Sequence, residues 1–461
     1  MADNTPRAAV SRRTLLAGAG AGLVALAGAV PVLRSTLASR DPATGPELPD
    51  LDELAWSTAP DGALVGHLIA GSTDTGLAYN GSVPGPLLRL HEGQQVDVHF
   101  RNDLDTHSSL HLHGVPAPPA VDAPLTHLEP GQSDVRELTI PAGSAGTYWY
   151  HPHAHGDVER QMLAGLAGPV VVHGPVDDTP GLAEADDRLL MLTARRGVIS
   201  VNGVIRPRFT ARAATVRLRL LNATAGEHVL VAAVTGGRRD RLHLIATDGG
   251  LLDRPVEVEE VLLAPGERAE VLLLTEGPGR TEVRALPYST YGPGGEASPD
   301  QTLVDVMVPD GLSALPLPGR LLPVEAINPA SSARTRRIVL DKAADGGFTV
   351  DGKTFDGART DIKVDLGTTE IWEVVNAHST DHPFHLHSYA VQVLDRDGEP
   401  EPFVAWRDTV NVPAGATVRL LVPFRGEGGR TVYHCHIASH EDLGMMGVIE
   451  VAEPAPSQPE G

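Results

Sequence analysis

One cysteine lies between two histidines near the end of the chain, and it is the only cysteine among the 461 residues. The segment reads His434-Cys435-His436, and His440 and Met445 follow it. Successive side chains of a β-strand point to opposite faces. We therefore expect the Cys435 thiolate to bind one metal ion while the two flanking imidazoles bind others behind it. Such an arrangement can move electrons between metal centres.

Four clusters hold eleven of the twenty histidines. They are His111 and His113; His151, His153 and His155; His382, His385 and His387; and His434, His436 and His440. Two histidines separated by one residue on a strand face the same side, within reach of one ion or of an adjacent pair. Clustering of this density indicates metal binding rather than isolated surface or core histidines.

The ligand types favour copper over zinc. Zinc binds histidine and cysteine, but its structural sites are usually single, closed and tetrahedral. Two histidines, one cysteine and a weak methionine are the ligand set of a blue-copper electron-transfer centre. Cys435, His440 and Met445 supply three of these from one loop, and we expect His382 to supply the fourth. Eight other histidines remain, four in each of two parts of the chain, and they predict a second cluster between those parts.

Three stretches of the chain share one pattern. Each contains a strand-like run, an asparagine, a polar turn and a second strand-like run; the stretches are 96–114 with Asn102, 216–234 with Asn222, and 369–389 with Asn376. The 49 glycines and 38 prolines indicate many turns and short strands rather than long helices. We therefore predict an all-β chain of three homologous Greek-key β-sandwich units.

Pro-rich and Gly-rich breaks separate these units. The predicted limits are 1–45 for a signal peptide and linker, 46–175, 183–312 and 330–453 for the three units, and 454–461 for a tail. The middle unit lacks the histidine-rich strands. We predict that it carries no metal ligands and acts as a spacer that sets the distance between the outer two.

The N-terminus predicts export. Ser11-Arg12-Arg13 precedes a moderately apolar, Gly/Ala-rich run that extends to about Leu33, which resembles a Tat signal. The glycines and weak hydrophobicity argue against the alternative of a retained anchor. We expect no stable membrane span after signal removal, and a periplasmic, extracellular or cell-surface location. The formal net charge of −22 makes nucleic acid and anionic membranes poor partners. Nothing in the sequence indicates an oligomeric state.

The histidine motifs resemble those of a known family. HLHG at 111–114, HPH at 151–153, HPFHLH at 382–387 and HCHIASHEDLGMM at 434–446 are similar to the four copper-binding signatures of multicopper oxidases, in the family's order. The resemblance implies three cupredoxin-like domains and four copper ions per chain. The implied ligands are His382, Cys435, His440 and Met445 for type 1 copper, His111 and His385 for type 2, and His113, His151, His153, His387, His434 and His436 for the type 3 pair. His155 matches no ligand position.

The same resemblance implies an oxidase in which a donor gives electrons singly to type 1 copper and O2 is reduced to water at the other three ions. Asp122 resembles an acid near type 2 copper in bacterial relatives, and Glu441 resembles one that feeds protons to the type 3 pair. The alternative for each is a solvated loop carboxylate. Asp408 matches another motif of the family, for which we expect a structural or ligand-supporting role.

The donor is the least determined feature. We predict a laccase-like enzyme acting on phenols and aromatic amines, with Cu(I) or Fe(II) as alternatives. The six methionines form no cluster away from the ligand loop, which disfavours Cu(I). A ferroxidase would need acids beside His382 or His440, where Asp381, Glu441 and Asp442 are candidates.

Three further interpretations fit the sequence less well. A simple electron carrier would not need the eight extra histidines. A copper-free structural protein, like division-associated relatives of this fold, should have lost ligands. A nitrite reductase typically has two such domains.

Overall fold

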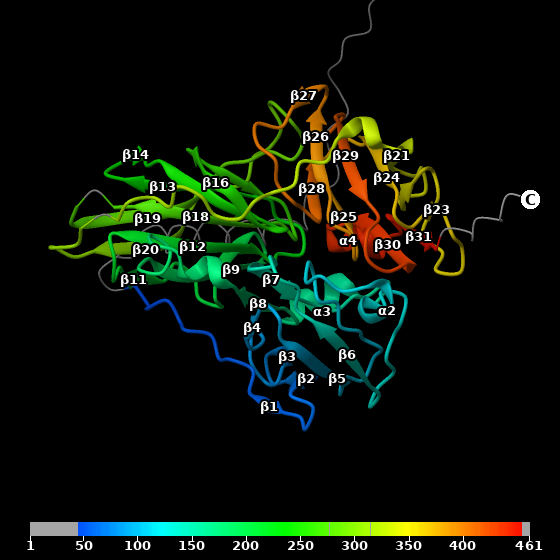
Figure 1. The fold of residues 1–461 in the computed structure, drawn as a ribbon, viewed down its shortest axis with the longest axis horizontal. Coiled ribbons are helices and arrows are strands. Elements are labelled where there is room, and N and C mark those ends of the chain that lie inside the picture. Colours follow the sequence, from blue (N-terminus) through cyan, green and yellow to red (C-terminus); the bar gives the residue numbers. More distant parts are fainter. Residues whose placement is uncertain (1–44, 276, 314, 454–461) are drawn as a thin grey trace, which may run out of the picture. The chain divides into compact units, whose positions relative to one another are not determined.

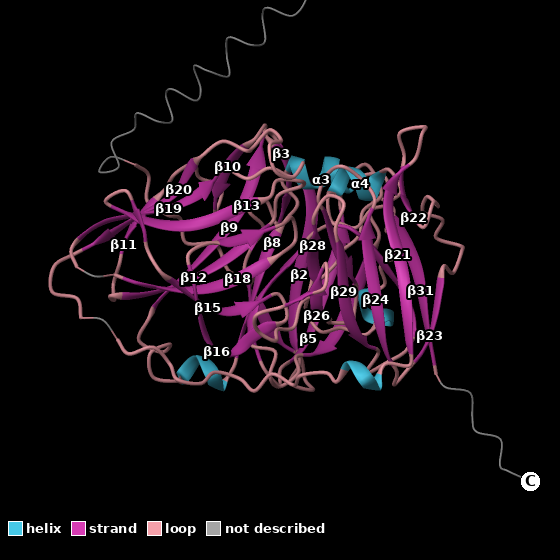
Figure 2. Ribbon diagram, turned by 90° about the horizontal axis from the view of Figure 1, so that it is seen from above, coloured by secondary structure: helices cyan, strands magenta, loops and turns pink. Residues whose placement is uncertain are grey.

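The computed structural model describes residues 45–275, 277–313 and 315–453. The predicted tail, and all but the last residue of the predicted signal segment at 1–45, lie outside these residues. Strands make up most of the regular structure and the helices are short (Figure 2), which confirms the prediction of an all-β fold. Within the described part of the chain, no helix has the length and apolarity needed to span a bilayer.

The first group of strands forms two sheets, drawn in blue to teal in Figure 1. One has the order β1-β2-β5-β6 with β3 beside β2, and the other has the order β4-β8-β7. The bounds are β1 Trp56–Thr58, β2 Leu64–Thr73, β3 Gly76–Tyr79, β4 Leu88–His91, β5 Gln95–Asn102, β6 Ser133–Thr139, β7 Gly146–Tyr150 and β8 Gly168–His173. Short helices lie at α2 Pro119–Asp122, α3 Val158–Ala164 and η2 Pro175–Asp178.

The second group, mostly green in Figure 1, also forms two sheets. Their orders are β10-β9-β12-β18-β15-β16, and β11-β20-β19-β13-β14 with β17 beside β13. The bounds are β9 Asp186–Arg195, β10 Val198–Val201, β11 Arg208–Thr210, β12 Thr215–Asn222, β13 Val229–Thr235, β14 Arg238–Arg239, β15 Leu242–Thr247, β16 Gly250–Val258, β17 Val261–Leu263, β18 Arg268–Leu274, β19 Gly279–Leu286 and β20 Gln301–Val308.

The third group, yellow to red in Figure 1, has the sheet orders β22-β21-β24-β29-β26-β27 and β23-β31-β30-β25-β28. The bounds are β21 Arg334–Lys342, β22 Phe348–Val350, β23 Ile362–Asp365, β24 Thr369–Asn376, β25 His382–Leu386, β26 Gln392–Arg396, β27 Glu399–Pro400, β28 Thr409–Val412, β29 Thr417–Pro423, β30 Gly429–Cys435 and β31 Met446–Ala452. The helices are η3 Pro329–Ser331 and α4 Ala438–Asp442.

The predicted repeat is visible in one sheet of each group. β5 runs parallel to β2 and antiparallel to β6, β12 lies in the same way between β9 and β18, and β24 lies between β21 and β29. These central strands end at Asn102, Asn222 and Asn376. Each asparagine side chain donates to two backbone carbonyls and accepts the N–H two residues later. The shared asparagine therefore closes the same turn three times.

Each group has its own apolar core. β24 buries alternate residues, including Trp372 and Val374, as expected for a strand with one face on a core. β12 is buried along its whole length because its second face is covered by β7 of the first group. A further apolar cluster contains residues of all three groups, among them Trp149, Leu221 and Ala438. The groups thus meet in a packed junction, next to the histidine motifs.

Candidate metal centre

Two of the four histidine motifs lie on paired strands of the third group. β25 pairs with β30 so that His385 lies opposite His434 and Phe384 opposite Cys435. Because side chains alternate along β30, the thiol of Cys435 lies in the core of the third group while the ring of His434 points to the junction with the first group. The opposite orientation expected for these two neighbours is therefore present.

The other two motifs lie in loops, which differs from the predicted strands. His111 and His151 exchange backbone hydrogen bonds of 3.0 and 3.1 Å in an isolated antiparallel bridge. The ladder does not continue because Pro152 has no N–H to donate and the chain turns at Gly114, whose φ is +77°. The bridge still holds the two motifs side by side.

The thiol belongs to a group of three potential ligands within the third group of strands. Cys435 Sγ lies 3.3 Å from His382 Nδ1 and 3.6 Å from His440 Nδ1, and these nitrogens are 3.2 Å apart. Met445 is fully buried in the same apolar cluster as Cys435. One sulfur and two nitrogens at these separations can share one ion, and a neighbouring thioether completes the blue-copper donor set.

The eight remaining motif histidines meet where the first and third groups join. Close contacts group them as His113 with His151 and His436, His153 with His387 and His434, and the pair His111 and His385. These sets overlap, because the ligand atoms of His111 also lie within 4.8 Å of those of His113 and His151 and of those of His385 and His387. In the first set, His113 Nδ1 lies 3.4 Å from His151 Nε2, and in the second, His387 Nε2 lies 3.0 Å from His434 Nε2. The structure therefore brings together all eight histidines predicted for this cluster, in overlapping sets that could hold metal ions.

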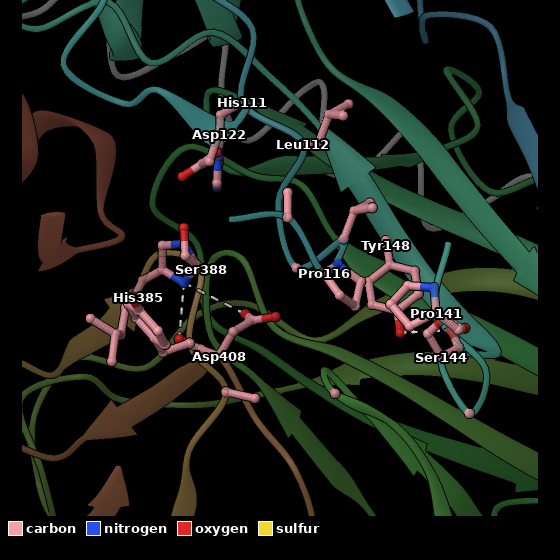
Figure 3. A pocket seen from close by; sticks show the side chains of 18 of the residues that line it. His111, Leu112, Pro116, Asp122, Pro141, Ser144, Tyr148, His385, Ser388 and Asp408 are labelled. Carbon is pink, nitrogen blue, oxygen red and sulfur yellow. Dashed lines mark hydrogen bonds and ion pairs between the residues drawn. The ribbon is translucent and has the colours of Figure 1, made fainter. Parts of the chain in front are cut away.

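The pair borders a cavity of about 260 Å³. Figure 3 shows His111 with Asp122 on one side of this cavity and His385 with Ser388 and Asp408 on the other. His111 Nε2 and His385 Nε2 are buried and have no hydrogen-bond partner. Buried polar atoms without partners are rare in folded proteins, so these two nitrogens fit a metal ligand role beside a route for small molecules.

Burial keeps most of the candidate imidazole ligands neutral, with His434 as an exception. It lowers the pKa of His151 to about 4 and that of His440 to about 3, and it lowers the pKa of His113 well below its ordinary value. These imidazoles are neutral at pH 7 and offer a lone pair. Burial raises the pKa of Cys435, so that a metal ion must displace the thiol proton when it binds.

Two acids hold the outer nitrogens of the cluster histidines. Asp122 Oδ1 lies 2.6 Å from His111 Nδ1 and its Oδ2 lies 2.7 Å from His387 Nδ1. Glu441 lies between His153 Nε2 and His434 Nδ1, at 3.2 Å from each. Burial opposes ionisation of Glu441, but His434 outweighs it and the pKa of Glu441 falls below its usual range. Both carboxylates are buried, so neither is a solvated loop residue.

Comparison with known proteins identifies the family. Two family models, both described as multicopper oxidase, match residues 66–177 and 328–455. Cell division protein FtsP of Escherichia coli (strain K12) is 30% identical over 463 residues, covering 90% of this chain and 92% of that protein. Multicopper oxidase mco of Staphylococcus haemolyticus is 27% identical over 403 residues, covering 81% and 83%.

The chain belongs to the multicopper oxidase family. Two solved structures of the family resemble it throughout. A multicopper oxidase from Campylobacter jejuni, described as a metallo-oxidase, has a TM-score of 0.78 at 26% identity and covers 90% of this chain and 97% of that one. The laccase-like multicopper oxidase CueO from Ochrobactrum sp. has a TM-score of 0.77 at 28% identity, covering 87% and 100%. The three groups of strands are therefore cupredoxin-like domains, and the chain is a copper-dependent oxidoreductase that uses O2.

Several residues that surround the predicted type 1 ligands were not predicted from the sequence. Phe348 stacks on His440 with ring centroids 3.8 Å apart. His382 is fully buried, and its Nε2 lies 3.3 Å from Nδ1 of the half-buried His378. Asp381 is also buried, and it accepts hydrogen bonds from Tyr288 Oη at 2.6 Å and from Asn411 Nδ2 at 2.9 Å.

Of these neighbours, His378 has a usable sequence signal, because it lies four residues before the HPFHLH motif. Tyr288 comes from the middle domain of this multicopper oxidase and has no sequence signal.

The sequence patterns did not point to two further residues: Trp149, which touches the larger histidine cluster, and Arg268, which reaches it through Asp408. Trp149 stacks on His151 with ring centroids 4.2 Å apart, and its place in the Tyr-Trp-Tyr-His run was a usable signal. Arg268 lies in the middle domain, is fully buried and pairs with Asp408. His155, which matched no ligand position, lies 3.2 Å from a nitrogen of His127 and outside the sets of potential ligands.

Proposed function

We propose that this multicopper oxidase couples four one-electron oxidations of a phenol or an aromatic amine to the reduction of O2 to two molecules of water. One observation carries the proposal: two clusters of potential ligands share one backbone segment. Cys435 Sγ belongs to the smaller cluster, and the rings of His434 and His436 belong to the larger one. A centre that accepts electrons singly is thereby kept apart from a centre that can hold O2.

Four copper ions per chain are the proposed complement. The type 1 ion would be held by His382, Cys435, His440 and Met445, the type 2 ion by His111 and His385, and the type 3 pair by His113, His151, His153, His387, His434 and His436. The donor types fit copper, and the unpaired Nε2 atoms of His111 and His385 would gain a partner. When bound, the copper ions supply the electron transfer and the oxygen chemistry.

The chain's own residues shorten the path and orient the ligands. Cys435 is covalently joined to both flanking histidines, so the two clusters are connected through side-chain and backbone bonds alone. Asp122 accepts from the Nδ1–H groups of His111 and His387, which leaves Nε2 of each ring free to bind a metal. The burial of the whole larger cluster excludes bulk water from the place where O2 is reduced.

Reduction of O2 to water consumes protons, and we propose that two carboxylates relay them to the cluster. We propose Asp122 as the acid on the type 2 side, since it lines the cavity that reaches His111 and His385. We propose Glu441 for the type 3 side, since it contacts His153 and His434.

The state of the nearby acids supports an organic donor over a metal ion. Asp381 is 2% exposed and its oxygens already accept from Tyr288, Asn411 and the backbone of Ala414. Glu441 faces the larger cluster. Asp442 accepts the first N–H groups of α3, from Val158 and Glu159. None of the three acids that flank the type 1 ligands in sequence is therefore free to hold Fe(II) or Cu(I), while the aromatic ring of Tyr288 is partly exposed beside Asp381.

Two other functions remain as alternatives. The similarity to a Campylobacter jejuni protein described as a metallo-oxidase favours Cu(I) or Fe(II) as the donor. The similarity to cell division protein FtsP raises a structural role without copper. The presence of every ligand that the family pattern requires supports an enzyme over that structural role.

Export and domain limits are also proposals. The twin-arginine segment supports export by the Tat route to the periplasm, the cell surface or the medium, with no stable membrane span after signal removal. We propose domain limits at 46–175, 183–312 and 330–453. The grouping of the sheets, whose strands come from 56–173, 186–308 and 334–452, supports this proposal.

The proposal is tested by loading the purified protein with copper and recording visible and EPR spectra. O2 uptake is then followed with a phenol, Fe(II) and Cu(I) in turn. We expect a blue thiolate absorption, separate type 1 and type 2 EPR signals, and fastest O2 uptake with the phenol. Copper binding without O2 uptake on any donor would contradict an oxidase. Faster O2 uptake with Fe(II) or Cu(I) than with the phenol would show that the donor is a metal ion instead.

A further inference from the structure

We propose that Arg268, in the middle domain, is a positioning residue for the oxygen-reducing cluster: it fixes Asp408, and Asp408 fixes the rings of His113 and His385. The middle domain is then a working part of the metal centre rather than the spacer that its lack of ligands predicts. This inference rests on the proposed copper assignment for His113 and His385.

Arg268 is fully buried and all its polar groups are engaged. Its two terminal nitrogens donate to the two oxygens of Asp408, at 2.8 and 2.6 Å. The remaining donor capacity goes to the backbone carbonyls of Thr147 in the first domain and of Asp248 and Gly266 in the middle domain. A bidentate, charge-assisted pair of this kind fixes orientation as well as distance. The guanidinium therefore contacts all three domains and holds Asp408 in one position.

Asp408 passes this constraint on to two predicted ligands. Its Oδ1 lies 2.9 Å from His113 Nε2, and its backbone carbonyl lies 2.9 Å from His385 Nδ1. In each ring the nitrogen that faces Asp408 must carry the proton, because a carboxylate or carbonyl oxygen can only accept. The other nitrogen, His113 Nδ1 or His385 Nε2, is then left with its lone pair facing the cluster.

Loss of the guanidinium would leave the carboxylate of Asp408 buried without its charged partner, which is costly. Displacement of Asp408 would remove the acceptor that orients His113.

The packing leaves little room for the network to rearrange. Gly266 lies against the ring of His436, where an added Cβ would be only 2.9 Å from ring atoms. Gly114, which follows the first histidine motif, lies against Arg268, where a Cβ would be 2.1 Å from its Nη2. Both glycines have positive φ, at +88° and +77°. The turn that precedes β18 is thus fitted directly onto the histidine cluster.

The type 1 ligands have no comparable contact with Arg268. The side chains of His382, Cys435 and His440 contact one another and His378, and none of them is bonded to Arg268 or Asp408. The inference therefore predicts an effect on one metal centre and not on the other. This asymmetry separates a positioning role from general destabilisation of the fold.

The test compares Arg268→Met and Arg268→Lys with Arg217→Met. Arg217 is a matched control, because it is a buried arginine of the same domain that pairs with Glu270 and Asp177. It contacts none of the predicted ligands. After copper loading, copper content, the type 1 blue absorption, the type 2 EPR signal and thermal stability are measured for each variant.

We expect Arg268→Met to keep the blue absorption and to lose the type 2 signal together with at least one copper ion per chain. Arg268→Lys should bind an amount of copper between those of the wild type and Arg268→Met, because it keeps the charge and loses the bidentate geometry. If Arg268→Met does not fold, the copper content and type 2 signal of Arg268→Lys test the inference in its place. Arg217→Met should lose thermal stability and keep both signals.

A full copper complement with an unchanged type 2 spectrum in Arg268→Met would overturn the inference, as would parallel loss of type 1 and type 2 copper. If the wild-type protein itself binds no copper, the proposed function fails instead.

Discussion

At the residue scale, the centre depends on which nitrogen of each imidazole carries the proton. Oxygen atoms of Asp122 and Asp408 accept hydrogen bonds from the outer N–H groups of three rings, so that the inner nitrogens point to the cluster. These rings belong to His111, His387 and His113. Single substitutions at these contacts should act on one metal ion more than on the fold. Two residue-scale predictions concern the thiolate and one strained backbone position.

Replacement of Cys435 by serine should abolish the blue absorption and donor oxidation while leaving the larger cluster able to bind copper. The reason is that Cys435 contributes only to the smaller site, whereas all eight cluster histidines are unchanged. Copper content and the type 2 EPR signal check this result. Normal turnover of the variant would show that electrons do not pass through this residue.

Ser388→Gly should raise the free energy of unfolding by about 1 kcal/mol. Ser388 follows the HPFHLH motif, has φ of +63°, and its buried hydroxyl has no hydrogen-bond partner. Relief of left-handed strain and of an unpaired hydroxyl should exceed the entropy cost of glycine. Denaturant unfolding measures the change.

Asp397→Gly is the control for this prediction, since Asp397 also has positive φ, at +50°, but its side chain accepts the N–H of Thr417. The control should gain nothing. Equal stabilisation of both variants would attribute the effect to backbone strain alone, and destabilisation of Ser388→Gly would contradict the prediction.

At the scale of elements, the asparagine that ends each central strand shows how far internal repetition can be used. Asn102, Asn222 and Asn376 were selected from the sequence because they recur at matching places, and each closes an equivalent turn. By contrast, Arg268 and Tyr288 approach the metal sites from the middle domain, which the sequence marks only by missing histidines. Local repetition predicts turns, but contacts between domains depend on how whole sheets pack.

Asn222→Ala should lower the free energy of unfolding by about 3 kcal/mol without changing copper content. The variant loses three buried hydrogen bonds and leaves two carbonyls and one N–H of the turn without partners. Because the side chain of Asn222 bonds neither Arg268 nor a predicted ligand, folded molecules should keep the Arg268–Asp408 pair and load copper as the wild type does.

Urea unfolding and metal analysis check this prediction. Asn328→Ala is a suitable control, since the side chain of Asn328 accepts only one exposed N–H, from Ala330, and its loss should cost no more than ~1 kcal/mol. A similar loss of unfolding free energy in both variants would show that the hydrogen bonds of Asn222 stabilise the fold no more than a single exposed one does.

At the scale of the whole molecule, the assembly buries many neutral imidazoles where its domains meet. The motif spacing was sufficient to predict that these histidines cluster, whereas the assignment of individual copper ligands stays a prediction. The spacing did not predict that the carboxylate of Asp381 accepts hydrogen bonds from Tyr288 and Asn411, because those partners are distant in sequence. The proposed donor class therefore rests mainly on the structure, whereas the proposed metal rests mainly on the sequence motifs.

The copper-free protein should lose stability as the pH falls from about 6.5 to 5. An unfolded histidine takes up a proton near pH 6.5, whereas burial holds the pKa of His151 and of His155 at about 4 in the folded state. The unfolded state then binds more protons, and each such histidine costs about 1.4 kcal/mol per pH unit below 6.5.

Carboxyl and imidazole groups with raised pKa values act in the opposite sense, but they are outnumbered by the buried histidines with lowered values; they are His434, Asp442, Asp248, Glu267 and Glu227. Urea unfolding of chelator-treated protein at several pH values measures the trend. A stability that stays constant or increases over this range would contradict it.

The most direct test of the central claim is the location of copper by anomalous diffraction at its absorption edge, on crystals of the loaded protein. The account predicts one ion among His382, Cys435 and His440, and three ions among the eight histidines at the junction of the first and third domains. A single site, or copper bound away from both groups, would contradict two centres joined through Cys435.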